Sequence, residues 1–561
     1  MFKEIVIQAN PLETVAAVLE DHRLAEIYFE RSMEQRLVGN IYRGKVENVL
    51  PGMQAAFIDI GLEKNAFLYV EDAFPAKPEG GHKEVEKQQP NIGDLLKKGQ
   101  TLIVQVTKEP QGTKGPRVTT NITLPGRYLV LMPMLDYIGI SRRITDETER
   151  NRLKKIAQDL DRGNIGVIVR TIAQGYSEEE LKDDFNSLFQ TWLKIKSKMQ
   201  SLAAPVLIHS DLELMQRLLR DILTEDTDRI VVNSRNTYLK TLDYAETLAP
   251  NLKHKIMLKE TEELLAEYQI PLQIEQALKR KIWLNCGGYL IIEHVEALTV
   301  IDVNTGKYVG STTLADTVFR TNIDAAVEIA RQLRLRDIGG IVIIDFIDMS
   351  NEGHRSLVLE TLEKELKKDR TKTHILGLTQ LGLVELTRKK VRQEISNILQ
   401  KDCPYCRGRG KVLSEETISL EARRQIAAFA ALTTAPIIKV KVHPAVAALL
   451  VGEEGRLLAQ LQEQTGKKII VFGFSSIHLE DVKLERKQQL DPLENIWPVK
   501  IGEILTVEIE SDSNAGKQDG VVMLDGHEVQ VKGSSEYMGQ YVPIQITHVG
   551  SVSAKAKVIG R

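Results

Sequence analysis

Two short apolar runs that each end in an aspartate constrain the fold of this chain most strongly. The run LTVI leads directly into Asp302 and then Asn304, and about forty residues later the run IVII leads into Asp345. Apolar runs of this length are typical of buried strands. Because strand and helix patterns alternate over 280–400, we expect both aspartates to follow strands of one sheet in an α/β domain.

Two strand-end carboxylates suit a hard divalent cation. Mg²⁺ takes oxygen ligands and is commonly held by one or two carboxylates together with phosphate oxygens. Asp302 and Asp345 are therefore candidate Mg²⁺ ligands, Asn304 could orient a ligand or substrate, and Asp348 is a further candidate. Asp is also a common turn residue, so the alternative is that these residues only terminate strands.

The segment 36–119 is a series of short alternating strands with Gly and Pro turns, which is typical of an all-β barrel. It resembles an OB-type barrel of a ribosomal protein that binds RNA. Such barrels bind single-stranded nucleic acid through surface aromatics and nearby cations. Phe57, Phe67 and Lys114 are candidates for this role, although the spacing of the two phenylalanines also fits core residues.

The tetrad CPYC places Cys403 and Cys406 two residues apart in a compact turn. A redox motif is expected at a helix N-terminus that follows a strand, whereas this one follows a helix. A zinc site needs four ligands, and Cys286, in the predicted hairpin WLNCGGYL, is interpreted as a core thiol. A zinc site would therefore need another chain to complete it.

Length indicates several domains, and the strand and helix patterns indicate a multidomain α/β and β protein. At 561 residues several domains are expected, and a net charge of −3 means that any surface for nucleic acid must come from local clustering. No apolar run approaches the roughly 18–20 residues of a membrane span. Three cysteines favour a reducing compartment, so we expect a cytoplasmic protein with no membrane span.

Three segments together resemble the RNase E/G family of single-strand-specific endoribonucleases. These are ALTVIDVNTG, ARQLRLRDIGGIVIIDFIDM and CPYCRGRG. The resemblance implies that Asp302 and Asp345 bind catalytic Mg²⁺, that Asn304 assists, and that Cys403 and Cys406 of two chains share one structural Zn²⁺. It also implies a homodimer through this zinc link, with a tetramer as a further possibility.

The resemblance, which covers about residues 1–440, and separate motifs in the C-terminal segments together give an expected domain order. The expected domains are a first RNase H-like piece (1–35), an OB-type RNA-binding barrel (36–119), a 5′-phosphate sensor (120–210), a second RNase H-like piece (211–279), a DNase I-like catalytic domain (280–400), a zinc link (401–414), a KH-like small domain (415–490) and a TRAM/OB-like domain (491–561). The barrel is thus expected as an insertion between the two RNase H-like pieces.

The family has a pocket that senses a 5′-monophosphate at the end of the RNA. Its glycine and valine match Gly126 and Val130 in PGRYLV, and its arginine–threonine pair matches Arg170 and Thr171 in IVRT. A guanidinium can fork onto two phosphate oxygens while a hydroxyl donates to a third. Without the resemblance, the IVRT segment predicts no more than the end of a strand.

The C-terminal modules carry weaker motifs. The GEEG tetrad at 452–455 resembles the G-x-x-G loop of a KH domain, but two glutamates suit a phosphate backbone poorly. The TRAM-like match at 491–561 departs from the best-known bacterial members of the family. The expected function is Mg²⁺-dependent cleavage of single-stranded RNA, both rRNA precursors and mRNA. The alternative is a non-catalytic RNA-binding or ribosome-maturation protein.

Overall fold

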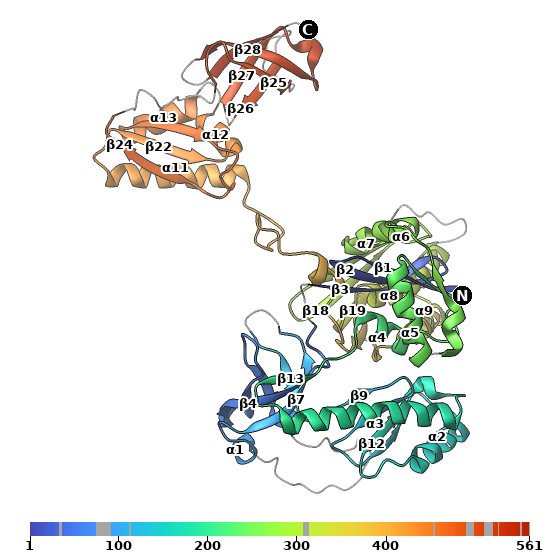
Figure 1. The fold of residues 1–561 in the computed structure, drawn as a ribbon. Coiled ribbons are helices and arrows are strands. Elements are labelled where there is room, and N and C mark those ends of the chain that lie inside the picture. Colours follow the sequence, from blue (N-terminus) through green and yellow to red (C-terminus); the bar gives the residue numbers. More distant parts are fainter. Residues whose placement is uncertain are drawn as a thin grey trace. The chain divides into compact units, whose positions relative to one another are not determined.

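The fold is taken from a computed structural model of the whole chain. It describes residues 1–32, 36–73, 91–110, 114–248, 250–306, 314–452, 455–489, 499–509, 520–524, 527–549 and 553–559. The chain divides into two compact units, Met1–Leu399 and Gln400–Arg561, which we describe separately (Figure 1).

The first sheet joins two distant segments of the chain. Its strands, in sheet order, are β15 (Ile256–Leu258), β14 (Arg229–Val232), β1 (Lys3–Ala9), β2 (Glu13–Glu20) and β3 (Arg23–Arg31). The helices of this region are α4 (Leu214–Asp221), α5 (Arg235–Leu248), η4 (Pro250–Lys255), α6 (Leu264–Glu267) and α7 (Ile270–Leu278). The parallel pairing of β1 with β14 brings 1–35 and 211–279 into one sheet, and the RNase H-like assignment stays a prediction.

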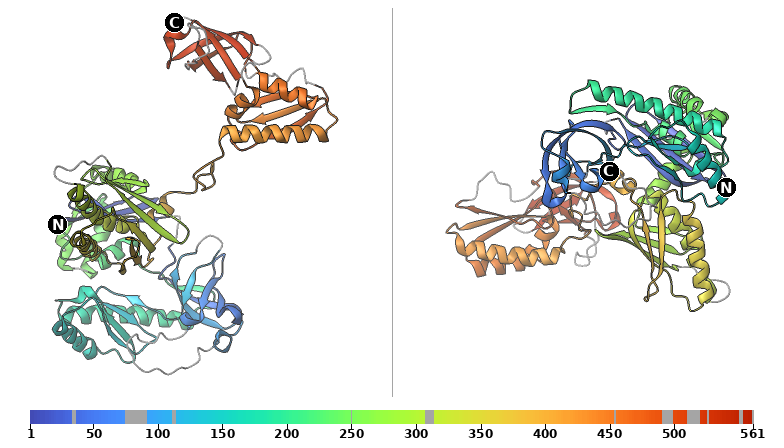
Figure 2. Two further views of the ribbon diagram at one scale, coloured as in Figure 1. Left: turned by 180° about the vertical axis from the view of Figure 1, so that it is seen from behind. Right: turned by 90° about the horizontal axis from the view of Figure 1, so that it is seen from below.

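A closed five-stranded barrel follows β3 in the chain. Its strands are β4 (Ile41–Leu50), β5 (Ala55–Asp59), β6 (Ala66–Tyr69), β8 (Arg117–Thr119) and β7 (Thr101–Lys108), in this spatial order, with β13 (Val206–His209) added beside β4. Pairing of β4 with β7 closes the barrel, which is seen in the right-hand view of Figure 2. Short helices η1 (Pro51–Met53), η2 (Val70–Ala73) and α1 (Ile92–Leu95) flank it. The barrel is consistent with the expected OB type.

The segment after the barrel forms a four-stranded sheet with a long helix along it (Figure 1). The strands, in sheet order, are β11 (Ile138–Ile140), β12 (Gly166–Val169), β10 (Leu129–Met132) and β9 (Leu124–Pro125), and the helices are α2 (Glu147–Asp159), η3 (Thr171–Ala173) and α3 (Glu178–Ser201). Ser177 and Glu180 form a reciprocal capping box at the start of α3, which satisfies N–H groups that the helix leaves unpaired.

A six-stranded sheet carries both predicted aspartates. Its order is β16 (Lys281–Trp283), β17 (Tyr289–His294), β18 (Leu298–Asn304), β19 (Gly340–Asp345), β21 (Val384–Arg388) and β20 (Thr373–Leu378). Helices α8 (Leu314–Leu335) and α9 (Glu352–Leu366) pack against one face, and α10 (Ile395–Leu399) ends this unit. Alternate strand residues such as Ile301 and Ile344 are fully buried under these helices, so the residues between them face the other way.

The second unit begins with the CPYC turn and a small α/β domain. Its sheet order is β23 (Lys468–Gly473), β22 (Ile437–Val442) and β24 (Lys483–Lys487), with helices α11 (Glu415–Leu432), α12 (Pro444–Val451) and α13 (Arg456–Thr465). The Tyr405 ring lies 4.2 Å from the His478 ring, and Arg409 pairs with Glu480 at 2.6 Å. These contacts hold the turn against the small domain.

A five-stranded sheet ends the chain. Its strands are β25 (Ile504–Glu508), β28 (Tyr541–Val549), β29 (Ser553–Val558), β27 (His527–Lys532) and β26 (Gly520–Leu524), with η6 (Ser535–Tyr537) between two of them. The strand order and the parallel pairing of β27 with β29 repeat those of the first barrel. Among the described residues β25 and β26 are not paired with each other, so the closure of the expected TRAM/OB-like barrel stays a prediction.

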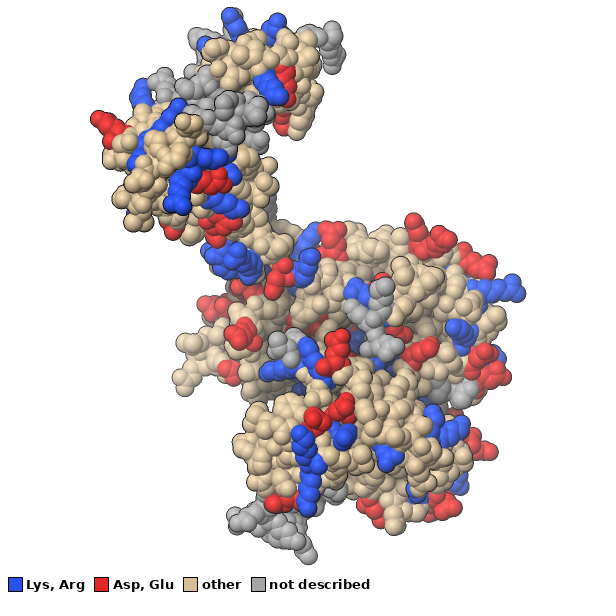
Figure 3. All heavy atoms as spheres, turned by 60° about the vertical axis from the view of Figure 1, so that its left-hand side comes forward, with Lys and Arg blue, Asp and Glu red and all other residues tan. Residues whose placement is uncertain are grey.

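Charges are mixed on the one face of residues 1–399 that Figure 3 shows. On the face of residues 1–399 seen in Figure 3, lysine and arginine side chains are interspersed with acids instead of forming one continuous basic patch. This agrees with the net charge of −3. Within the described ranges, none of the helices has the length and apolar character needed to cross a membrane.

Candidate active site

The two predicted aspartates are direct neighbours on parallel strands. β18 and β19 pair in a register that sets Asp302 opposite Asp345. Both residues alternate with buried core positions, Ile301 and Ile344, so their side chains project from the face of the sheet that α8 and α9 leave uncovered. The structure thus brings together two carboxylates that are 43 residues apart in the sequence.

Asn304 lies on the same face, two residues along β18. Its Nδ2 donates a hydrogen bond to Asp302 Oδ2 at 2.8 Å. Burial raises the pKa of Asp345, and the negative charges of Asp302 and Asp348 raise it further. A cation between the carboxylates would relieve this repulsion, so the donor set fits a divalent metal.

The carboxylate pair alone does not complete a metal site. In the described ranges, no three His, Cys, Asp or Glu side chains form a group that could hold a metal ion. Asp348 instead lines a separate pocket of about 310 Å³ beyond the end of β19. Mg²⁺ normally keeps several waters and takes substrate phosphate oxygens as ligands, so two protein carboxylates are compatible with a site that the substrate completes.

Phe57 and Phe67 lie on the outside of the barrel. They are paired on β5 and β6, with ring centroids 5.9 Å apart in an edge-to-face arrangement. Both are half-buried, and their neighbours in sequence, including Ile58 and Leu68, fill the barrel core. The two rings therefore form a surface pair, although contact with RNA stays a prediction.

Lys114 is exposed at the start of the strand segment that leads into β8. Gly115 follows it, where an added Cβ would lie only 2.0 Å from the carbonyl oxygen of Asn65. The backbone approach therefore requires glycine and fixes the position of Lys114. Arg43, by contrast, donates to the carbonyl of Met199 at 2.9 Å, so it holds the end of α3 to the barrel.

The four predicted sensor residues gather at adjacent strand ends. Gly126 follows β9, Val130 lies in β10, and Arg170 and Thr171 follow β12, which pairs with β10. The Asp184 carboxylate accepts three backbone N–H groups from residues 127–129. A Cβ on Gly126 would lie 2.6 Å from that carboxylate, which explains the glycine.

The guanidinium of Arg170 is already occupied. It donates to the carbonyl of Gly126 and pairs with Asp221 at 2.7 Å. Burial tends to raise the pKa of Asp221, but hydrogen bonds and charge from Arg220 and Arg170 outweigh burial and hold the pKa below its ordinary value. A phosphate at this position would have to displace Asp221. This partner, 51 residues along the chain, was not predicted from the sequence.

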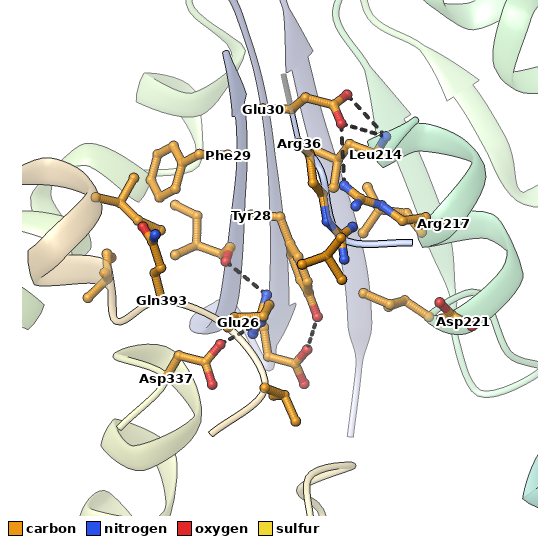
Figure 4. Close-up of a pocket in the computed structure, with 18 of the residues that line it drawn as sticks. Glu26, Tyr28, Phe29, Glu30, Arg36, Leu214, Arg217, Asp221, Asp337 and Gln393 are labelled. Atoms are coloured by element: carbon orange, nitrogen blue, oxygen red, sulfur yellow. Dashed lines mark hydrogen bonds and ion pairs between the residues drawn. The ribbon is translucent and has the colours of Figure 1, made fainter. Parts of the chain in front are cut away.

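Asp221 also lines a pocket of about 620 Å³ between β3, α4 and the loops around Asp337 and Gln393 (Figure 4). In this pocket the Tyr28 hydroxyl donates to Glu26 at 2.5 Å. Burial tends to raise the pKa of Glu26, but Arg334 and Arg370 dominate and lower it to about 2. The pocket therefore contains a dense network of paired charges that joins the first sheet to residues 334–398.

The link cysteines are accessible, and the third cysteine is not part of the link. Cys403 is exposed and Cys406 is half-buried, and Cys406 Sγ accepts the N–H of Gly410 at 3.3 Å. Backbone hydrogen bonds from Cys406 and Tyr405 lower the pKa of the Cys403 thiol, which favours the thiolate that zinc binds. Cys286 packs instead against the hydrophobic core beneath α8 and α9.

The sequence reasoning missed an aromatic group beside the aspartates. Trp283 on β16 is 59% exposed, its ring centroid lies 5.5 Å from that of Tyr289, and Lys281 lies over both rings. In the segment KIW, Lys281 and Trp283 are two residues apart, and this spacing indicates that both lie on one face of a strand. The side of the sheet that these residues occupy was not predictable from that pattern.

Comparison with known proteins shows the family of this chain. The model of the Ribonuclease E/G family matches residues 123–391. Ribonuclease G of Salmonella typhimurium is 44% identical over 473 residues, which cover 84% of this chain and 97% of that protein, and Ribonuclease G of Escherichia coli gives the same values. Ribonuclease E of Nostoc sp. is 42% identical over 405 residues, which cover 70% of this chain and 58% of that protein.

A second model, described as the thioredoxin-like domain of RNase E/G, matches residues 402–487. This description differs from the KH-like module expected for 415–490, and the two glutamates of the GEEG tetrad lie outside the described residues. The similarity to ribonuclease G covers nearly the whole length of that protein. The chain therefore belongs to the ribonuclease E/G family.

Proposed function

We propose that this member of the ribonuclease E/G family is an endoribonuclease that cleaves single-stranded RNA at Asp302 and Asp345 with a divalent cation, Mg²⁺. The observation that carries the proposal is the register that sets these two carboxylates side by side on the sheet face opposite α8 and α9. Family membership supports ribonuclease activity. The proposed products are a 3′-hydroxyl and a 5′-phosphate, from rRNA precursors and mRNA.

The chain's own residues have distinct tasks in this proposal. Asp302 and Asp345 would hold the cation, and the Nδ2 donor of Asn304 fixes the orientation of the Asp302 carboxylate. When bound, Mg²⁺ supplies positive charge for the scissile phosphate and a water of lowered pKa. The raised pKa of Asp345 means that a cation also favours its ionised state.

The barrel and the sensor would select the substrate. Phe57 and Phe67 offer an exposed aromatic pair to unstacked bases, and Lys114 offers a cation to the backbone. Arg170 and Thr171 would favour RNA with a 5′-monophosphate, because a guanidinium binds phosphate in a bidentate manner.

The CPYC turn would join two chains through one Zn²⁺. Cys403 and Cys406 supply two thiolates, while structural zinc takes four ligands. The small domain keeps this turn in place through Tyr405 and Arg409. A homodimer with one zinc per two chains follows, and a cytoplasmic location is expected since a reducing compartment keeps the thiols free for metal.

A cleavage assay tests the proposed activity. Asp302→Asn and Asp345→Asn should each lower the rate of cleavage of a 5′-labelled single-stranded RNA by about a hundredfold or more, the scale of losing a key electrostatic group. Omitting Mg²⁺ should have a similar effect. RNA binding by gel shift should persist, because the barrel surface is unchanged.

An exposed acid elsewhere provides the control. Glu47→Gln replaces a carboxylate that is half exposed on the barrel and should leave the rate unchanged. If both aspartate variants cleave at the wild-type rate, the assignment of the site is wrong. Binding without Mg²⁺-dependent cleavage in the wild type would favour the alternative, a non-catalytic RNA-binding protein.

A further inference from the structure

An aromatic and basic group lies on the same sheet face as the two aspartates. Strand pairing sets Trp283 opposite Tyr289, and Tyr289 opposite Asn304. Neighbouring strands are about 4.8 Å apart. Tyr289 is therefore about 5 Å, and Trp283 about 10 Å, from the row of residues that contains Asn304 and Asp302.

Exposure distinguishes this group from a core cluster. Trp283 is 59% exposed, whereas its neighbour Leu284 is 6% exposed. A large aromatic side chain that remains exposed to water contributes little burial free energy to folding, so stability of the fold does not explain a tryptophan at this position. In proteins that bind single-stranded nucleic acid, exposed aromatic rings commonly stack on bases.

Lys281 adds a cation to the rings. Its Nζ lies 3.7 Å from the Tyr289 ring centroid and 4.1 Å from the Trp283 ring centroid. This position keeps the ammonium group beside the rings through cation–π attraction. A positive charge held here can attract a phosphate of an RNA strand that passes over the β-sheet toward Asp302.

The turn after β18 fixes the inner ring. Gly306 has a φ of +62°, and an added Cβ there would lie 2.6 Å from the carbonyl oxygen of Gly287 and 3.3 Å from Tyr289 Cδ1. The backbone can therefore approach the Tyr289 ring this closely only with glycine. Packing of the Tyr289 ring against this turn and against the Trp283 ring, with centroids 5.5 Å apart, would reduce the entropy cost of stacking.

We propose that Trp283, Tyr289 and Lys281 form a base-stacking subsite that holds one nucleotide of single-stranded RNA beside the scissile phosphate. This inference rests on the proposed cleavage at Asp302 and Asp345 and adds a substrate contact to it. Trp283 stacks on the base, Tyr289 contacts the edge of the base that is nearer Asp302, and Lys281 pairs with a phosphate of the RNA backbone. RNA fits this surface because it offers both a π-face and a negative charge at adjacent positions.

Tryptophan fluorescence tests binding without cleavage. Among the three tryptophans, Trp192 is 7% exposed and Trp497 lies outside the described residues. In the full-length Asp302→Asn variant, a single-stranded oligoribonucleotide should quench the emission. Adding Trp283→Phe should remove most of the quenching, and adding Trp497→Phe should not. Quenching that survives Trp283→Phe would overturn the proposal.

Cleavage of RNAs with one abasic position tests the stacking itself. Trp283→Ala should lower kcat/KM for intact RNA by about tenfold, the lower range of base stacking on an aromatic side chain. The same variant should change little on an RNA that lacks the base at the position bound by Trp283. Trp283→Phe should retain most of the activity, because it keeps an aromatic face.

Leu376→Ala is the matched control, since Leu376 is 69% exposed on another strand of the same sheet. It should leave kcat/KM unchanged. If Trp283→Ala lowers kcat/KM equally on intact RNA and on every abasic RNA, Trp283 does not stack on a base and the subsite is overturned. A lower molecular mass of this variant in light scattering would show that Trp283 contacts protein and would overturn the subsite as well. Wild-type cleavage by Asp302→Asn would instead refute the proposed function itself.

Discussion

Replacing Arg170 by alanine should remove the preference for RNA that carries a 5′-monophosphate. Cleavage of the same RNA with a 5′-hydroxyl should be nearly unchanged, because Arg170 is expected to contact only the terminal phosphate. The variant also removes the ion pair with Asp221, whose two side chains are only partly buried, so the fold should persist.

The structure allows an estimate of the size of this preference. The Arg170–Asp221 pair has side chains that are 26% and 32% exposed, and pairs of this kind contribute about 0.2–1 kcal/mol. A hydrogen bond between charged groups contributes about 1.5–3 kcal/mol, and phosphate can accept two from one guanidinium. Phosphate should therefore displace Asp221 with a net gain of at least about 2 kcal/mol, or a preference of roughly thirtyfold or more.

Asp221→Asn gives a prediction of opposite sign. Removing the competing carboxylate should increase the preference for the monophosphate by up to about fivefold, which corresponds to the free energy of the lost pair. Asp221 also pairs with Arg220, which is buried. Thermal unfolding of the variant must therefore be measured alongside its activity.

The assay is kcat/KM for two RNAs that differ only in the 5′ group. Arg162→Ala is the matched control, because Arg162 also pairs with an exposed carboxylate, Asp136, in the same domain. An equal loss on both RNAs by Arg170→Ala would mean that Arg170 is structural or belongs to the general RNA path. An unchanged preference would place the sensor elsewhere.

Three further predictions concern the zinc link, the barrel and acid stability. Elemental analysis should find one zinc per two chains, and Cys403→Ser with Cys406→Ser should release zinc and weaken the dimer in light scattering; one zinc per chain would rule out the shared site. Phe57→Ala and Phe67→Ala should each weaken binding of single-stranded RNA by about 1–3 kcal/mol in gel shifts. The pKa of Glu26 falls from 4.5 to about 2 on folding. Its contribution to the free energy of unfolding, on the order of 3 kcal/mol, is therefore present above pH 4.5 and is lost as the pH falls toward 2. In urea denaturation, Glu26→Gln should make the free energy of unfolding depend less on pH between about 4.5 and 2.

Each of these has a control elsewhere in the chain. Cys286→Ser changes a thiol outside the link and should leave zinc and dimer unchanged. Phe2→Ala removes a phenylalanine that is 36% exposed on the first sheet and should not affect RNA binding. If Phe57→Ala loses stability as strongly as a core truncation, the ring is structural, and if Glu26→Gln leaves the acid limb unchanged, other carboxylates control it.

The pair of strand-end aspartates could be anticipated because two apolar runs ended in the same kind of residue. The sequence did not determine that β18 and β19 are adjacent, since a whole helix, α8, lies between them. The sequence also did not determine the register of β18 with β19. A shift of one residue would have pointed the Asp345 side chain into the core that the helices cover. Only the fold sets Asp302 directly opposite Asp345.

The ion pair between Arg170, a predicted sensor residue, and Asp221 could not be predicted from the sequence. Arg170 and Asp221 are on different elements, and charged residues are too common for such a pair to be singled out from a single sequence. The same limit applies to Trp283, whose exposure depends on which side of β16 faces the helices. In the small domain, a glycine loop between two helices suggested a KH-like module, but the matching family model is described as thioredoxin-like.

The most direct test of the account is Mn²⁺ binding, with Mn²⁺ as a paramagnetic substitute for Mg²⁺, followed by electron paramagnetic resonance. The wild type with a non-cleavable RNA should bind the ion at a site that Asp302→Asn and Asp345→Asn each weaken by roughly tenfold or more, because both carboxylates are ligands of one cation. Asp348→Asn should have a smaller effect. Unchanged Mn²⁺ affinity in both variants would contradict a metal site shared by Asp302 and Asp345.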